Sequence, residues 1–251
     1  MERKKVKWIV PLIVVTCMVY LIGLIAVHLN QRAMIFLPSH GVVENSPLEK
    51  WTSCKGVIGF KREVDGASRI WFMMHGNAGQ AAHRSYVLPH LPESDSFFVL
   101  EYPGYGKRPG APYKDSFNSA AEEAYQVLRE THPEAEIVVV GESIGSGPAS
   151  HLATTDHPPA RIVLITPFDS MINLASHHAG WFPASLIIKD DWDNIKALED
   201  FNGQLQIFGA LQDRITPFMM SKRLAESVKG AVLIELDCDH NDWMKRELGL
   251  K

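Results

Sequence analysis

Hydrophobic positions along this chain fall into one long uninterrupted segment followed by a series of short runs. The long segment, residues 8–29, holds 22 positions without Asp, Glu, Lys or Arg. Most of the later runs are continuously apolar, as expected of strands that are covered on both faces. These seven runs lie at residues 58–60, 69–74, 96–100, 137–140, 161–165, 205–208 and 231–236.

Helical periodicity appears between the later runs. One pattern repeats at i, i+4, i+7 and i+11 and ends before Pro133, and a second begins at Pro217. The apolar positions are Phe117, Ala121, Ala124 and Leu128 in the first and Met220, Leu224 and Val228 in the second. Strands that alternate with helices after a strand-rich start predict an α/β fold, with a mostly parallel central sheet flanked by helices and antiparallel strands early. No repeat or linker divides residues 31–251, which we expect to form one domain.

Residues 8–29 are predicted to form a transmembrane helix. At about 1.5 Å per residue, 22 residues are long enough to cross a hydrocarbon core of roughly 30 Å. The preceding residues 1–7 carry Arg3, Lys4, Lys5 and Lys7, while only Arg32 follows closely. Because positive charge stays on the cytoplasmic side, the sequence predicts a single-pass protein with a cytoplasmic N-terminus and a catalytic domain on the periplasmic, extracellular or lumenal side.

Two other interpretations of this segment remain open. A cleaved signal peptide has a shorter apolar core and a small-x-small site, and residues 26–30 (AVHLN) offer no such pair. A lipid-modified Cys17 would lie in the middle of the apolar run. We therefore favour an uncleaved signal anchor.

Composition excludes several classes of partner and cofactor. The formal net charge is −4 and there is no basic excess, so no nucleic-acid partner is expected. The acidic cluster at residues 190–193 lacks the glycine and the glutamate of a calcium-binding loop, and we interpret it as a solvated helix start. No metal and no organic cofactor is predicted.

The pentapeptide GESIG at residues 141–145 has the features of a nucleophile elbow. It follows the apolar run 137–140 and precedes a segment of small residues. A serine hydroxyl attacks only if it stands at the tip of a sharp, strained turn, and glycines two residues to either side permit that turn. Ser143 is the predicted nucleophile.

A serine nucleophile needs a histidine base and an orienting carboxylate. His240 follows the run that ends at residue 236, and Asp213 follows the run 205–208. Asp169, which comes after the run 161–165, is the rival acid. His177 and His178 lie between two strands and are interpreted as surface or pocket-rim residues.

Two glycine-bearing loops follow earlier strands. The sequence HGNAG at residues 75–79 comes directly after the run 69–74, and its backbone N–H groups are placed to approach an oxyanion. The sequence EYPGYG at residues 101–106 follows the next run and is equally consistent with a tight turn. Ligands bind at the carboxyl ends of the strands in such sheets, which favours a role for the first loop.

Together these segments resemble the membrane-anchored alpha/beta-hydrolase-domain proteins, including bacterial YfhR-like members. The resemblance covers nearly all of residues 31–251. It implies an alpha/beta-hydrolase fold, Ser143, Asp213 and His240 as the catalytic triad, and the N–H groups of Asn77 and Ile144 as the oxyanion hole. The approach to the histidine at residues 236–239 (LDCD) departs from the longer glycine-rich approach that is frequent in the family.

These features predict a serine hydrolase that cleaves carboxylic esters or thioesters through an acyl-enzyme. Residues 169–203 are sufficient for a short lid. Its apolar residues either pack on the sheet or form a wall near the bilayer that admits acyl chains, so the substrate is a small-molecule or lipid ester. These residues are Trp181, Phe182, Pro183, Leu186, Ile187 and Ile188.

Two alternative functions remain, a peptidase and a non-catalytic binding module. A serine peptidase of the same fold would need a pocket for an amino terminus or a charged side chain, and Glu142 is the only charge beside the nucleophile. We interpret Glu142 as facing solvent. A non-catalytic, membrane-tethered binding module would be expected to lack a triad member, and all three are present.

Overall fold

A mostly parallel sheet lies at the centre of the computed structural model, which describes residues 2–44, 46–54, 56–180 and 182–250. The order of its strands is β1-β2-β4-β3-β5-β6-β7-β8. The pairs β1–β2 and β2–β4 are antiparallel and all later pairs are parallel. The strands are β1 (Glu49–Ser53), β2 (Gly56–Arg62), β3 (Arg69–Met74), β4 (Ser96–Leu100), β5 (Glu136–Glu142), β6 (Arg161–Ile165), β7 (Gln204–Ala210) and β8 (Val232–Leu236).

The predicted strands are confirmed, and one was missed. All seven apolar runs coincide with strands β2 to β8. The missed strand, β1, is an edge strand in which only Trp51 is fully buried. An edge strand needs no continuous apolar run because one side of its backbone faces solvent, so β1 carries no strong sequence signal.

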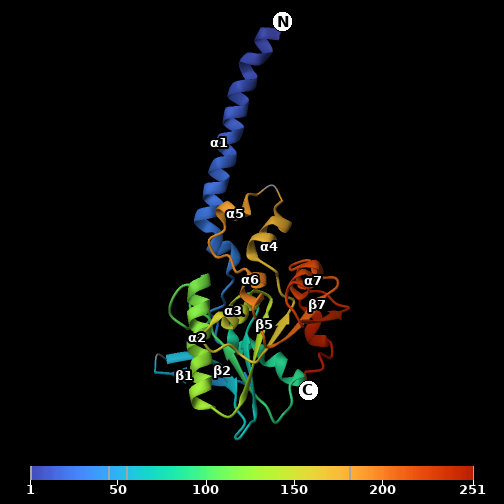
Figure 1. Cartoon of the computed structure of the whole chain (residues 1–251). Helices are drawn as coiled ribbons and strands as arrows, with labels where there is room; N and C mark the ends of the chain where they lie inside the picture. Colours follow the sequence, from blue (N-terminus) through green and yellow to red (C-terminus); the bar gives the residue numbers. More distant parts are fainter. Residues whose placement is uncertain (1, 45, 55, 181, 251) are drawn as a thin grey trace.

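Helices cover both faces of the sheet (Figure 1). Alternate residues of β3 contribute to two separate core clusters, with Ile70, Phe72 and Met74 in one and Trp71 and Met73 in the other. The helices that follow the first strands in the chain are α2 (Lys114–Thr131), α3 (Ser146–His151), α4 (Met171–His178), α5 (Ala184–Ile187), α6 (Asn194–Leu198) and α7 (Phe218–Ser227). Short 3₁₀ segments are η1 (Ala81–His90), η2 (Ser143–Gly145), η3 (Leu152–Thr154) and η4 (Asp242–Lys245).

Both predicted helices form and bury the predicted stripes. Helix α2 buries its whole apolar stripe from Phe117 to Leu128. Helix α7 begins directly after Pro217 and buries Met220 and Leu224. Amphipathic periodicity therefore identified the two longest helices of the α/β domain correctly.

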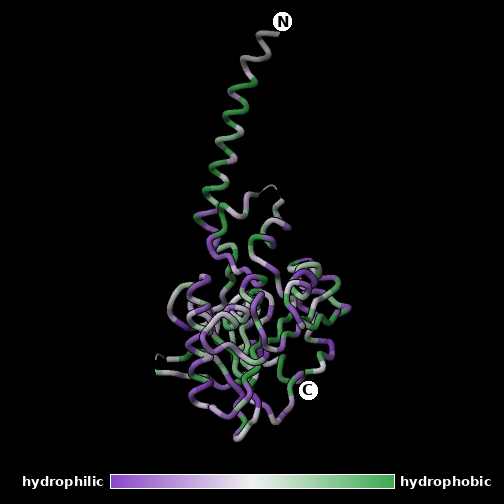
Figure 2. The backbone as a smooth tube through the Cα atoms, viewed as in Figure 1, coloured by the Kyte–Doolittle hydropathy of each residue, from purple (hydrophilic) through white to green (hydrophobic). Residues whose placement is uncertain are grey.

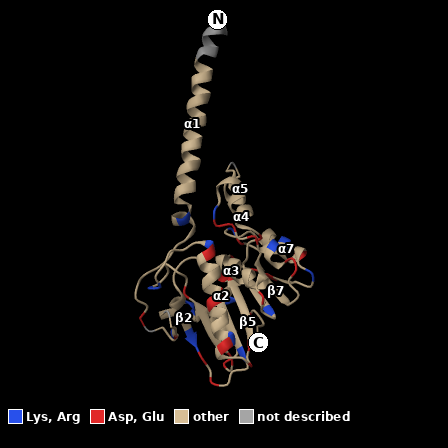
Figure 3. Ribbon diagram, turned by 60° about the vertical axis from the view of Figure 1, so that its left-hand side comes forward, with Lys and Arg blue, Asp and Glu red and all other residues tan. Residues whose placement is uncertain are grey.

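Helix α1 (Glu2–Ile35) stands away from the sheet and is longer than the predicted segment (Figure 1). From Trp8 to Ile35 it is long and apolar enough to cross a membrane. Its large apolar side chains are exposed, including Trp8 at 79% and Leu29 at 70%. Figure 2 shows this helix as a mainly hydrophobic rod, and in Figure 3 charge appears on its described part only near its lower end. In the sequence, Arg32 is the one charged residue between residues 8 and 35.

The segment between β6 and β7, which the sequence predicts to be a lid and which is called the lid below, carries the short helices α4, α5 and α6. It is closed at its base by a hydrogen bond from the Met171 N–H to the Trp192 carbonyl, 2.9 Å, and by a bridge between Ser170 and Asp193. Helix α5 lies beside the lower end of α1 (Figure 1), where Leu186 is 79% exposed. Trp181 lies outside the described residues.

The interpretation of residues 190–193 as a solvated helix start is wrong for Asp190. Its carboxylate is buried and forms an ion pair with Arg32. Asp193 does begin α6, because its side chain accepts the Lys196 N–H at 3.0 Å. A cluster of acidic residues in the sequence does not reveal that Asp190 is buried against Arg32, which lies more than 150 residues away in the chain.

Candidate active site

Ser143 lies on a strained turn at the carboxyl end of β5. Its φ angle is 52°, in the left-handed region that non-glycine residues seldom adopt. A Cβ atom on Gly145 would lie 2.1 Å from the Met74 carbonyl oxygen, and one on Gly141 would lie 2.7 Å from Cβ of Ala149. Both glycines are therefore required for close packing, and the turn has the geometry of a nucleophile elbow.

His240 follows β8 and reaches the Ser143 side chain. Its Nε2 lies 3.0 Å from Ser143 Oγ, and its Nδ1 lies 2.6 Å from Asp213 Oδ2. Because a carboxylate accepts hydrogen bonds, the Nδ1 carries the proton and Nε2 presents its lone pair to the serine hydroxyl. All three side chains are almost fully buried.

Asp213 is held in place by its own loop after β7. Its Oδ1 accepts the N–H groups of Ile215 and Thr216, both at 2.8 Å. The Thr216 hydroxyl lies 2.9 Å from Asp213 Oδ2, 2.9 Å from the Thr166 carbonyl and 3.1 Å from His240 Nδ1. Thr166 is the second non-glycine residue with a positive φ, 47°. Sequence reasoning missed Thr216, although a threonine three residues after an aspartate is a frequent turn partner.

The rival acid and the other candidate histidines have different partners. Asp169 forms an ion pair with Arg223 at 2.6 Å, and its other oxygen accepts the Ser170 N–H at 2.6 Å. His177 and His178 lie at the end of α4 and are exposed. The structure thus brings His240 against Asp213, and Asp169 is occupied elsewhere.

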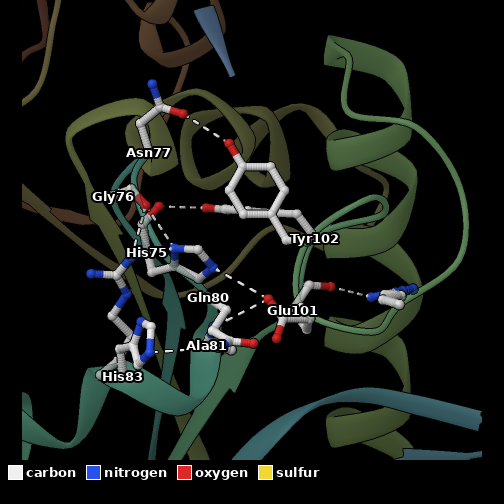
Figure 4. A network of polar contacts seen from close by, with 12 residues as sticks. His75, Gly76, Asn77, Gln80, Ala81, His83, Glu101 and Tyr102 are labelled. Atoms are coloured by element: carbon white, nitrogen blue, oxygen red, sulfur yellow. Dashed lines mark hydrogen bonds and ion pairs between the residues drawn. The ribbon is translucent and has the colours of Figure 1, made fainter. Parts of the chain in front are cut away.

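The loop after β3, residues 75–80, lies beside the elbow and is supported by the turn after β4 (Figure 4). The Tyr102 hydroxyl donates to the His75 carbonyl at 2.7 Å, and the Tyr105 hydroxyl donates to Asn77 Oδ1 at 2.8 Å. Glu101 Oε1 accepts the Ala81 N–H at 3.1 Å. The sequence EYPGYG is therefore a structural turn that buttresses this loop.

Two buried ionisable groups in this network have shifted pKa values. Burial lowers the pKa of His75 well below its usual value, so this imidazole is neutral at pH 7. Burial also raises the pKa of Glu101 to about 7, against the weaker opposing effects of the Ala81 N–H and of Arg84 and Arg108. His75 Nε2 lies 3.8 Å from Glu101 Oε1 (Figure 4).

Glu142 does not face solvent, contrary to the sequence interpretation. Its carboxylate is buried and accepts hydrogen bonds from the Gly76 N–H at 2.9 Å, the Tyr86 hydroxyl at 3.0 Å and Trp243 Nε1 at 3.1 Å. These donors come from the loop after β3, from η1 and from η4. The residue before the nucleophile therefore connects the elbow to the loop after β3 and to the segment that follows His240.

Within the described ranges, no group of three or more His, Cys, Asp or Glu side chains is arranged to hold a metal ion.

Comparisons with known proteins agree with this fold. A family model described as the alpha/beta hydrolase fold matches residues 72–186. The solved structure of the Pyrococcus furiosus esterase Pf2001 is similar with a TM-score of 0.66, at 15% identity, over 83% of this chain and 92% of that one. The chain has the alpha/beta-hydrolase fold. This confirms the predicted fold class, while the membrane anchoring and the YfhR-like subgroup stay predictions.

Two proteins are similar to this chain in sequence over most of its length. An uncharacterized protein of Mycobacterium tuberculosis is 27% identical over 210 residues, which cover 78% of this chain and 74% of the relative. The lysophosphatidylserine lipase ABHD12 of Danio rerio is 24% identical over 73% of this chain and 54% of its own length.

Proposed function

We propose that this protein is a serine hydrolase that cleaves carboxylic esters or thioesters through Ser143, His240 and Asp213. The observation that carries the proposal is the continuous series of contacts from Ser143 Oγ to His240 Nε2, 3.0 Å, and from His240 Nδ1 to Asp213 Oδ2, 2.6 Å. Both separations lie within hydrogen-bond reach, which general-base activation of a hydroxyl requires.

The reaction proceeds through an acyl-enzyme. Ser143 Oγ forms a bond to the carbonyl carbon while its proton passes to His240 Nε2. The tetrahedral intermediate then collapses, and the leaving alcohol or thiol takes that proton. A water molecule, deprotonated by His240, attacks the acyl-enzyme, releases the acid and restores the Ser143 hydroxyl. Asp213 holds the imidazole and stabilises its protonated form in both halves.

The oxyanion of each tetrahedral intermediate is assigned to the N–H groups of Asn77 and Ile144. Ile144 directly follows the nucleophile, the usual position of one donor in this fold. Among the described residues, the Asn77 N–H donates no hydrogen bond to the protein. Each such donor contributes roughly 3 to 4 kcal/mol of transition-state stabilisation.

Helix α1 is assigned as a single-pass membrane anchor, with residues 1–7 in the cytoplasm and the catalytic domain on the periplasmic, extracellular or lumenal side. The exposure of its apolar side chains supports this, since a rod of such surface is stable only in an apolar environment. The basic residues before it favour this orientation.

The substrate is assigned as an ester with a lipid-like acyl chain. Leu186 on the lid is exposed on α5, which lies beside the lower end of α1. An apolar side chain there is placed to contact an acyl chain that leaves the bilayer. The name of the Danio rerio relative, a lysophosphatidylserine lipase, points in the same direction.

The arrangement favours ester cleavage over a peptidase. A peptidase needs a charge near the nucleophile for an amino terminus, and Glu142 is engaged by three protein donors. The presence of all three catalytic side chains within contact distance also favours turnover over a non-catalytic binding role.

The test is labelling of the detergent-solubilised protein with a fluorophosphonate probe, followed by p-nitrophenyl esters of increasing acyl length. We expect wild type to label and Ser143→Ala to lose both labelling and hydrolysis. Ser150→Ala, on the helix after the elbow, is the matched control and should label normally because the Ser150 hydroxyl is buried without a partner. Unchanged hydrolysis in Ser143→Ala would refute the assignment.

A further inference from the structure

The last turns of α1 are attached to the lid by a buried side-chain amide. Gln31 is only 2% exposed. Its Nε2 donates to the Ile187 carbonyl at 2.9 Å, and its Oε1 accepts the Lys189 N–H at 2.7 Å. His28 Nδ1, one turn earlier, lies 3.0 Å from the same Ile187 carbonyl. The Gln31 amide thus acts as a peptide group that pairs with the lid backbone at the end of α5.

An ion pair one residue later fixes the end of the lid. Arg32 contacts the Asp190 carboxylate with two nitrogens, at 2.7 and 3.2 Å. Asp190 is buried, and its Oδ1 also accepts the Lys114 N–H at the start of α2, 2.9 Å. A bidentate pair with a buried acceptor is geometrically specific. The lid is therefore held between α1 and α2.

The next residue after α1 enters the core of the α/β domain. Phe36 is 3% exposed. Its ring packs against Phe117 of α2, with centroids 5.2 Å apart, and against Trp192 at the end of the lid, 6.3 Å apart. This contact fixes the lower end of α1 relative to both elements.

The same segment also contacts the loop that carries the proposed oxyanion donor. The Asn77 side chain donates to the Ile35 carbonyl and accepts the Leu37 N–H, the latter at 3.1 Å. The Gly79 N–H donates to the Leu37 carbonyl at 3.3 Å, and the Gly79 carbonyl accepts the Ser39 N–H at 3.0 Å. Residues 35–39 therefore lie along the loop after β3, with an isolated parallel β-bridge between Pro38 and Gly79.

We propose that the end of α1 and the segment after it, residues 28–39, form a positioning element of the active site, which sets the lid and the oxyanion loop relative to each other. The proposal rests on the proposed function. The lid contacts of Gln31 and the loop contacts of Ile35 are about one helical turn apart, roughly 5.4 Å. A shift at one contact is therefore transmitted to the other. Displacement of a catalytic donor by about 1 Å costs on the order of a hundredfold in rate.

On this view the N-terminal helix has a second role besides attachment. It contributes Gln31 as a positioning residue for the lid, and its carbonyl at Ile35 as a partner for the Asn77 side chain. Release of the helix from the domain lowers the reactivity of Ser143 even when the protein stays folded.

The test compares two isosteric substitutions in the full-length, detergent-solubilised protein. Gln31→Met keeps the volume but removes both amide contacts with the lid. Asn30→Leu is the matched control, since the Asn30 amide is exposed and bonds only to the Ala26 carbonyl of its own helix. Two quantities are measured: the second-order rate of fluorophosphonate labelling and the amide hydrogen exchange of residues 184–190 and 76–80.

We expect Gln31→Met to label at least tenfold more slowly and to exchange faster in both segments, while Asn30→Leu matches wild type. A merely structural role would lower the melting temperature without changing the labelling rate of the folded protein. Exchange in residues 76–80 that is unchanged by Gln31→Met would overturn the inference. A wild-type protein that does not label would contradict the proposed function, and the exchange comparison would still decide whether the helix positions the loop.

Discussion

The Glu142 carboxylate accepts the Gly76 backbone N–H at 2.9 Å and so joins the nucleophile elbow directly to the loop after β3. The contact is tight, because a Cβ atom on Gly76 would lie 3.2 Å from the Glu142 carboxyl group. Gly76 precedes Asn77, whose N–H is the proposed oxyanion donor. The Glu142 side chain is therefore one of the contacts that set the position of that donor relative to Ser143.

Glu142→Gln is expected to lower kcat by about 10 to 100-fold with a smaller change in KM. The neutral amide has one accepting oxygen for three donors, and an unsatisfied buried donor costs about 1 to 3 kcal/mol. The measurement is steady-state hydrolysis of a p-nitrophenyl ester alongside thermal unfolding. Glu93→Gln, at an exposed carboxylate, is the control. A kcat equal to that of wild type would show that Glu142 does not position the loop.

Gly145→Ala is expected to abolish activity and to destabilise the fold by at least about 3 kcal/mol. The added methyl group would lie 2.1 Å from the Met74 carbonyl, and both partners are backbone, so neither can move away cheaply. Gly41→Ala provides the control, because a Cβ atom there has no other atom within 4 Å. Soluble yield, thermal unfolding and fluorophosphonate labelling of both variants are measured. A folded and fully reactive Gly145→Ala protein would contradict the close approach of β3 to the elbow.

The fold was predictable from the sequence because the strands at the centre of a parallel sheet are apolar on both faces. β3, β4 and β6 were predicted to the residue, since each is a continuous buried run. β1 was missed because only Trp51 in it is fully buried. Local apolar pattern thus identifies the central strands and also β8, an edge strand that is itself apolar, but it misses β1 at the other edge.

The catalytic candidates were predictable for a different reason. Ser143, Asp213 and His240 each come directly after a strand that the sequence identifies, and parallel topology brings these loops to one edge. Glu142 and Asp190 were misjudged because their partners lie far away in the sequence, at Gly76 and Arg32. No local pattern reveals a hydrogen bond between segments that meet only in the folded chain.

Thr216→Val is expected to lower kcat by about tenfold and to leave the fold intact. Valine keeps the shape but removes the hydroxyl that lies 2.9 Å from both Asp213 Oδ2 and the Thr166 carbonyl. The carboxylate then loses one of its donors and holds His240 less firmly.

The comparison for this prediction is with Thr216→Ser, which restores the hydroxyl and should recover most of the rate. Thr155→Val removes a hydroxyl that bonds only to the Leu152 carbonyl and is the control. The pH dependence of kcat is measured for all of them. Equal rates for the serine and valine variants would show that the hydroxyl does not support the Asp213–His240 pair.

The buried Glu101 carboxyl is expected to make the protein less stable as the pH rises. Burial raises its pKa from the ordinary value of 4.5 to about 7. Between these two values the folded state holds a proton that the unfolded state has released. The free energy of unfolding therefore falls with increasing pH across this window, by at most about 1.4 kcal/mol per pH unit, and the contribution of Glu101 is constant above it.

Glu101→Gln removes this proton exchange, so the stability difference between the variant and wild type should grow in favour of the variant from pH 5 to pH 7. Thermal or urea unfolding of both proteins at pH 5, 6, 7 and 8 measures that difference. The lowered pKa of His75 makes the free energy of unfolding rise with pH, which is the opposite effect. Because His75 is present in both proteins, subtracting one stability curve from the other removes its effect and leaves that of Glu101. Glu93→Gln, at an exposed carboxylate, is the control. Parallel curves for Glu101→Gln and wild type would mean that Glu101 is already ionised in the folded protein at pH 5, and that Arg84 and Arg108 outweigh the effect of burial.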